Sequence, residues 1–163
     1  MRKFVFAAVA ATAVLLAATS GTAHAGAATH FKSGGIGENT FPAGTLCDFN
    51  YDETFTYEVN ITISPTGEID RLTIYNTHTN LDTGYALTEV DHITSLQPPG
   101  SPNVLQVGIF WHLVDPSGNH VLVKAGEATF DTVTGDLLNF TPNSGYDHSF
   151  AQTVCPLLGG NPV

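Results

Sequence analysis

Histidine side chains in β-rich segments are the first candidates for chemistry in this sequence. Asp91-His92 and Trp111-His112 lie in segments typical of strands, where successive side chains point to opposite faces. His92 and His112 could therefore face an interior, as metal ligands, as a general base or as a pH-sensitive pair. A hydrogen-bonded histidine on a strand surface is the more common role, and the sequence has no His-x-His spacing. We therefore predict no metal site and no cofactor.

Two carboxylates at alternate positions are the second candidate. Glu89 and Asp91 share one face of an expected strand, where they could bind a hard cation or act as a carboxylate pair. The alternative is a solvated face, because charged residues protect exposed strands from aggregation. The sequence contains no Gly-x-Ser-x-Gly turn, Walker loop or dinucleotide-binding fingerprint. It therefore assigns no catalytic residue.

Aromatic residues on the expected strands indicate where an apolar molecule could bind. An aromatic lining gives a pocket apolar walls, and its hydroxyl groups can orient a ligand. The same rings could instead fill a solid core. The candidate ligand-binding residues, which include the two histidines, are Tyr57, Tyr85, His92, Phe110, Trp111 and His112.

Short β-rich segments separated by turns are expected to position these residues. Apolar and polar residues alternate with a period of two from Phe55 to Ile63, which predicts a half-buried strand. Turns rich in Gly, Pro, Asn and Asp separate further such segments, at 72–79, 85–95, 104–115, 120–131 and 137–141. This spacing predicts an all-β fold: a small antiparallel β-barrel, a meander of six to seven strands, with a short C-terminal helical tail. Closure into a barrel would hide both sheet edges.

The two segments on either side of residues 117–118 form the clearest expected hairpin. With these two residues as its turn, Leu113 faces Leu122 and Ile109 faces Gly126. Apolar residues occur on both faces of the first segment. This pattern is typical of a covered outer wall or of a subunit interface.

The first twenty-five residues have the features of a signal peptide. A basic start and a small-apolar run precede the cleavage signature Ala23-His24-Ala25. Cleavage after Ala25 leaves three basic and fifteen acidic residues, a net charge of −12, which argues against nucleic-acid binding. We expect a secreted, extracellular protein with no stable membrane anchor after cleavage. The expected parts are the signal peptide over 1–25, a flexible N-terminal arm over 26–45 and a single β-barrel domain over 46–163.

The two cysteines lie near the two ends of the patterned region, at Cys47 and Cys155. An oxidising compartment favours a disulfide between them. Because the chain has no other cysteine, only one intramolecular pairing is possible. In a closed barrel this bridge would join the first strand to the final element.

Four features of the chain support a resemblance. These are the Ala-rich leader, Leu46-Cys47, the turn Asn80-Leu81-Asp82-Thr83-Gly84 and the tail Val154-Cys155-Pro156-Leu157-Leu158. With them the chain resembles uncharacterised exported proteins of actinobacteria, a resemblance that implies no activity and no catalytic residues. More distantly, the meander is similar to lipocalin and allene-oxide-cyclase barrels, although the lipocalin Gly-x-Trp signature is absent. Such folds include both binding proteins and enzymes.

The sequence favours an exported, non-catalytic β-barrel protein that binds a small apolar ligand or a protein partner. Sparse charge, aromatic strands and the lack of a catalytic motif support this hypothesis. One alternative is a barrel-type cyclase or isomerase that uses Tyr57, Glu89, His92 or His112 as acid and base. A third is a secreted inhibitor or surface-interaction protein that makes contact through residues 97–103.

Overall fold

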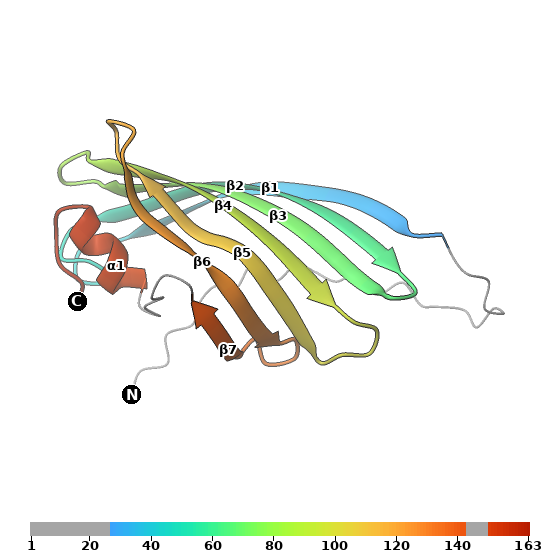
Figure 1. The fold of residues 1–163 in the computed structure, drawn as a ribbon. Coiled ribbons are helices and arrows are strands. Elements are labelled where there is room, and N and C mark those ends of the chain that lie inside the picture. Colours follow the sequence, from blue (N-terminus) through green and yellow to red (C-terminus); the bar gives the residue numbers. More distant parts are fainter. Residues whose placement is uncertain (1–26, 143–149) are drawn as a thin grey trace.

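Seven antiparallel strands and one helix make up the described part of the chain. The computed structural model describes residues 27–142 and 150–163, and the expected signal peptide lies outside them. The strands pair in sequence order (Figure 1), which confirms the all-β class, the meander and the helical tail. The elements are β1 (Thr29–Phe41), β2 (Tyr51–Ser64), β3 (Gly67–Asn80), β4 (Ala86–Gln97), β5 (Asn103–Val114), β6 (His120–Asp131), β7 (Leu137–Pro142) and α1 (Phe150–Leu157).

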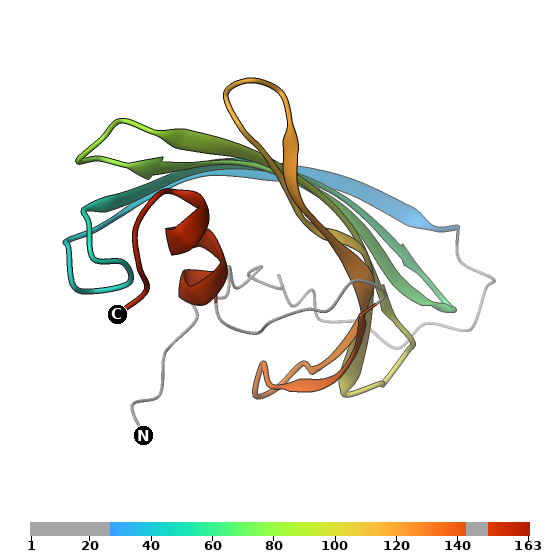
Figure 2. The ribbon, with the colours of Figure 1, turned by 60° about the vertical axis from the view of Figure 1, so that its left-hand side comes forward.

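The sheet is open, so the predicted closure into a barrel is wrong. Its order runs from β1 to β7, and these two strands are its edges. The edges are poorly matched, because β1 has 13 residues and β7 has 6. Figure 2 shows that the sheet curls strongly and that α1 lies on its concave side. The sheet thus has the curvature of a barrel without the final pairing.

Strand β1 occupies the segment for which the sequence predicts a flexible arm. Thr29–Phe41 pairs with β2 in a register that has no bulge. Two aromatic side chains of β2 explain why this glycine-rich segment forms a strand. A Cβ atom at Gly37 would overlap the Phe55 ring, and one at Gly35 would overlap the Tyr57 ring. Because these glycines have no side chains, the two rings of β2 pack directly over them, and this cross-strand packing stabilises β1.

The core lies at one end of the sheet, between α1 and the ends of the strands that α1 covers. Cys47 and Cys155 form the disulfide that the sequence predicts, with their Cα atoms 5.5 Å apart. The Asn80 side-chain amide donates to the Leu158 carbonyl oxygen at 3.1 Å and holds the end of α1. No helix within residues 27–142 and 150–163 is long and apolar enough to span a membrane. The buried core side chains are Cys47, Phe49, Tyr51, Leu87, Leu113, Val154, Cys155 and Leu158.

The β5–β6 hairpin follows the predicted register only from Trp111 to Leu113, because a second shift after Leu113 places Val114 opposite His120. Leu113 faces Leu122 as expected, but Ile109 faces Ala125, and not Gly126. The register shifts between Ile109 and Trp111, so Phe110 is an extra residue on β5. Such a bulge bends the strand and changes the direction of its side chains. A period-two pattern contains no signal for one inserted residue, so the prediction is wrong beyond this point.

Candidate functional site

The curvature of the sheet defines an inner, concave face and an outer, convex face. Tyr51, Leu87 and Leu113 pack with residues of α1 in the core, so their side chains point to the inner face. Side chains alternate along each strand, and the register aligns equivalent positions across the sheet. The inner face therefore carries the odd-numbered residues of β2 and β4 and the even-numbered residues of β3.

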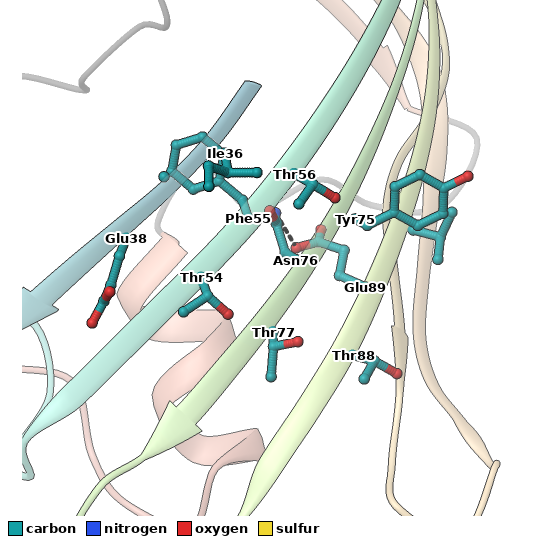
Figure 3. A pocket seen from close by; sticks show the side chains of 12 residues that line it. Ile36, Glu38, Thr54, Phe55, Thr56, Tyr75, Asn76, Thr77, Thr88 and Glu89 are labelled. Atoms are coloured by element: carbon teal, nitrogen blue, oxygen red, sulfur yellow. Dashed lines mark hydrogen bonds between the residues drawn. The ribbon is translucent and has the colours of Figure 1, made fainter. Parts of the chain in front are cut away.

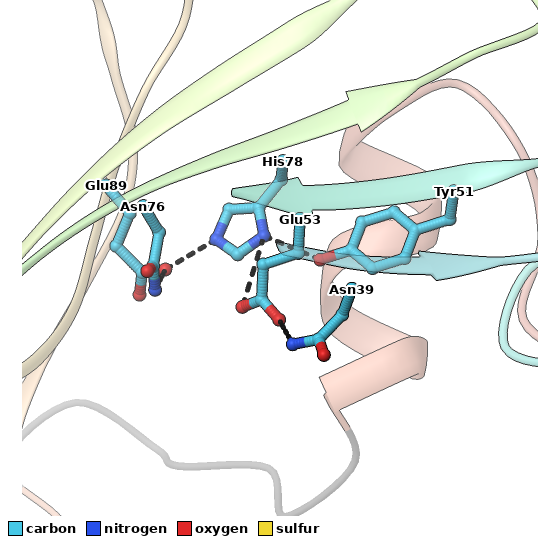
Figure 4. Close-up of polar contacts among 6 residues, drawn as sticks. All are labelled: Asn39, Tyr51, Glu53, Asn76, His78 and Glu89. Atoms are coloured by element: carbon cyan, nitrogen blue, oxygen red, sulfur yellow. Dashed lines mark hydrogen bonds and ion pairs between the residues drawn. The ribbon is translucent and has the colours of Figure 1, made fainter. Parts of the chain in front are cut away.

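A chain of hydrogen bonds links three buried side chains on the inner face (Figure 4). The Tyr51 hydroxyl lies 2.7 Å from Nδ1 of His78, and Nε2 of His78 lies 2.5 Å from Oε2 of Glu89. Asn76 Nδ2 donates to the same Glu89 oxygen at 2.9 Å. The exposed fractions of Tyr51, His78 and Glu89 are only 1%, 0% and 3%. Buried polar groups need such partners, because an unpaired one is costly.

Helix α1 covers this hydrogen-bonded chain. The Phe150 ring lies 5.6 Å from the His78 ring and 6.0 Å from the Tyr51 ring, centre to centre. A second carboxylate, Glu53, lies beside His78 with 4.0 Å between Oε1 and Nδ1. Asn39 on β1 donates to the other oxygen of Glu53 at 3.2 Å (Figure 4). These hydrogen bonds and the contact between Glu53 and His78 thus connect β1, β2, β3 and β4 beneath α1.

Asp91 is a second buried carboxyl next to Glu89. Its exposed fraction is 4%, and its Oδ1 atom has no hydrogen-bond partner in the described part of the chain. Burial raises the pKa of Asp91 to about 9, and the nearby Glu89 carboxylate adds to the shift by repulsion. Asp91 is therefore uncharged at neutral pH and can both donate and accept a hydrogen bond.

Replacing Asp91 with asparagine should remove a loss of stability that develops between about pH 4 and pH 9. Because the pKa is raised from 3.8 to about 9 by folding, the unfolded chain releases this proton first. The wild-type free energy of unfolding should therefore fall as the pH rises through this range. We expect Asp91→Asn to be about as stable as wild type near pH 4 and more stable by about 5 kcal/mol at pH 8.

Urea unfolding at a series of pH values measures this difference. Glu127→Gln is the matched control, because Glu127 is an exposed strand carboxylate. This control should follow the wild-type pH profile. An Asp91→Asn profile that stays parallel to wild type would show that Asp91 does not titrate in this way.

Aromatic side chains gather on the inner face near Asp91. The bulge in β5 brings Phe110 against Phe140 of β7, with ring centres 5.9 Å apart. The next residue, Trp111, contacts Phe150 of α1, and the Lys124 ammonium lies 5.1 Å from the Trp111 ring centre. The rings of Phe110 and Trp111 are therefore both on the inner face.

Two facing glycines lie beside these rings. Gly108 of β5 pairs with Gly126 of β6, and Gly108 also pairs with Ile93 of β4. Neither glycine has a side chain, so the backbone here is uncovered by its own residues. Aromatic walls beside a flat backbone floor are a suitable surface for a small apolar molecule.

The structure brings only some of the six predicted ligand residues together. Phe110 and Trp111 are neighbours on the inner face, and Tyr57 lies in the same cross-strand row as Ile74 and Asp91. Tyr85, in contrast, lies in the turn before β4 and is exposed.

The two predicted histidines lie on the outer face. His92 is exposed, and its Nδ1 atom is 3.2 Å from the Thr73 hydroxyl. His112 stacks on His120, with 2.6 Å between Nε2 and Nδ1. Neither histidine side chain therefore contacts Phe110 or Trp111 on the inner face. The described residues contain no group of three or more His, Cys, Asp or Glu side chains that could hold a metal ion.

An open hollow of about 630 Å³ lies on the outer face, across β1 to β4 (Figure 3). Its side chains are those of the outward-pointing positions, among them Thr54, Thr56 and Tyr75. Asn76 and Glu89 also border it, but their side chains bond to each other on the inner side of the sheet. The hollow is wide open, and its own side chains form no acid–base group like that around His78.

His78 and Tyr51 are functional candidates that the sequence analysis missed. Tyr51 is the first residue of β2, and His78 stands among threonines and asparagines at the end of β3. Local patterning gives no reason to bury either side chain. Only the register, which aligns His78 with Glu53 and Leu87, brings them into one group.

Comparison with known proteins identifies no relative of this chain. No family model matches the sequence. No curated protein and no solved structure matches it either.

Proposed function

We propose that the protein is an exported, non-catalytic binding protein that holds a small apolar molecule against its inner face. The ligand lies beside Phe110 and Trp111, over the backbone of Gly108 and Gly126. One observation carries this proposal: the bulge at Phe110, which turns both rings towards the face that holds Phe140 and Asp91.

The carboxyl of Asp91 supports a ligand with one hydrogen-bonding group. Its Oδ1 atom is buried without a partner among the described residues. A buried oxygen of this kind favours a ligand that supplies the missing hydrogen bond. An otherwise apolar molecule with a hydroxyl or amine group fits both Asp91 and the surrounding rings.

Export is supported by the disulfide and by the predicted leader. A bridge between Cys47 and Cys155 is compatible with an extracellular protein. The expected cleavage after Ala25 would release the chain into that compartment. The ligand would then be one that the cell encounters outside its membrane.

The enclosure of His78 favours binding over catalysis. A general acid or base must come within hydrogen-bond reach of its substrate. His78 is fully buried and Tyr51 is 1% exposed, both beneath Phe150 of α1. We therefore assign this hydrogen-bonded chain to the attachment of α1.

Binding of a neutral apolar dye such as Nile red tests the proposal. Trp111 is the only tryptophan of the chain, so quenching of its fluorescence reports on the inner face directly. We expect saturable binding with quenching, and a Kd at least about tenfold weaker in Phe110→Ala, because one wall of the surface is lost.

Tyr75→Ala is the matched control, because Tyr75 is a half-exposed aromatic residue on the outer face. It should bind the dye as wild type does. Native mass spectrometry of the protein from culture medium adds the mass of any retained ligand. No dye binding, or equal weakening by both variants, would overturn the proposal.

A further inference from the structure

The long edge strand β1 presents an unpaired side of its backbone. β1 has 13 residues, and among residues 27–142 and 150–163 it hydrogen-bonds with β2 alone. The backbone groups on its other side are a template on which another strand can pair. The β1–β2 register has no bulge, and Thr29–Phe41 contains no proline. Two common protections of a sheet edge are thus missing from this strand.

The two charged residues of β1 lie symmetrically about Gly35. Lys32 comes three residues before Gly35 and Glu38 three residues after it. Both side chains are exposed, and within the described residues neither forms an ion pair. When two copies of β1 run antiparallel with Gly35 opposite Gly35, each Lys32 faces Glu38 of the other copy. Opposite charges at facing positions stabilise a strand pair.

The same register covers the most exposed apolar side chain of the strand. Ile36 is 84% exposed. In the symmetric pair it faces Gly34 of the second copy, which has no side chain to obstruct it. Phe55 and Tyr57 already lie over Gly37 and Gly35 within one chain. An apolar side chain over a facing glycine is therefore the packing that this strand uses on its paired side.

We propose that two copies of this chain pair through β1, antiparallel and centred on Gly35, into one continuous sheet. The two-fold axis is perpendicular to the sheet, so that both inner faces lie on the same side of the dimer. No residue of the ligand surface at Phe110 and Trp111 takes part, because β5 lies four strands away from β1. The experiment on the dimer and the experiment on ligand binding therefore test the two proposals independently.

Charge reversal with sedimentation velocity tests the facing pair. We expect the wild-type chain to be dimeric, and Lys32→Glu and Glu38→Lys each to raise the dimer Kd by about tenfold or more. The double variant, in which the two charges are exchanged, should return to near wild-type affinity. Arg71→Glu and Glu127→Lys are matched controls, since these exposed charges lie on β3 and β6. Circular dichroism verifies that each variant remains folded.

Cysteine cross-linking tests the register. Lys32→Cys and Glu38→Cys, prepared separately, should give covalent dimers when mixed and oxidised, because facing Cα atoms lie within disulfide range. Neither variant should cross-link with itself, since identical positions lie far apart in this register. A wild-type chain that is monomeric up to about 1 mM would overturn the proposal. So would a dimer that withstands both charge reversals, or one whose mixed variants do not cross-link.

Discussion

Replacing Cys47 with serine should lower the free energy of unfolding by about 2–5 kcal/mol. The bridge to Cys155 closes a loop with a sequence separation of 108 residues, so it removes many conformations from the unfolded chain. It also holds α1 against the core, where both sulfur-bearing residues are buried. Urea unfolding followed by circular dichroism and by Trp111 fluorescence measures the loss.

Reduction of the wild-type protein is the control for this substitution. It should cost about as much stability as Cys47→Ser, while the β-sheet spectrum changes little, because the strand pairing does not involve the bridge. The Cys47→Ser/Cys155→Ser double variant should match the single variant. Unchanged unfolding curves after verified reduction would contradict the assigned role of the bridge.

Replacing His78 with alanine should cost about 3–5 kcal/mol, because it removes one of the two hydrogen-bond partners of the buried Glu89 carboxyl group. The Tyr51 hydroxyl and Glu89 Oε2 both lose the ring nitrogen to which they are bonded. The space beneath Phe150 is also left unfilled. The urea midpoint and the melting temperature should both fall.

His92→Ala is the matched control for this prediction. His92 is exposed on the outer face, and its hydrogen bond is to Thr73. Its removal should change stability by no more than about 0.5 kcal/mol, as for most surface substitutions. If the two histidine variants lost equal stability, the buried hydrogen bonds of His78 would not be the source of the effect.

The strands were predictable from the sequence because their signals are local. Alternation from Phe55 to Ile63 and the turns after it indicate each strand separately. The openness of the sheet was not predictable, since it depends on whether two distant edges meet. Strand β1 was missed because its glycines have low β-propensity, and the rings that compensate for them belong to β2.

The candidate site shows the same division between local and distant signals. Phe110 and Trp111 were predicted as ligand residues from their type, and Glu89 with Asp91 from their spacing on one face. The placement of His92 and His112 on the outer face depends on which face α1 covers, and no local pattern states this. His78 enters the site only through cross-strand neighbours on β2 and β4.

The sequence-ordered meander also determines the order in which the molecule can fold. Every strand pair joins segments that are adjacent in the chain, so each hairpin can form with a small entropic cost of loop closure. Docking of α1 is different, because it brings together residues 108 positions apart. We therefore expect the sheet to form first and the helix to dock on it afterwards. Oxidation of the two thiols would then follow the assembly of the sheet and hold α1 in its docked position.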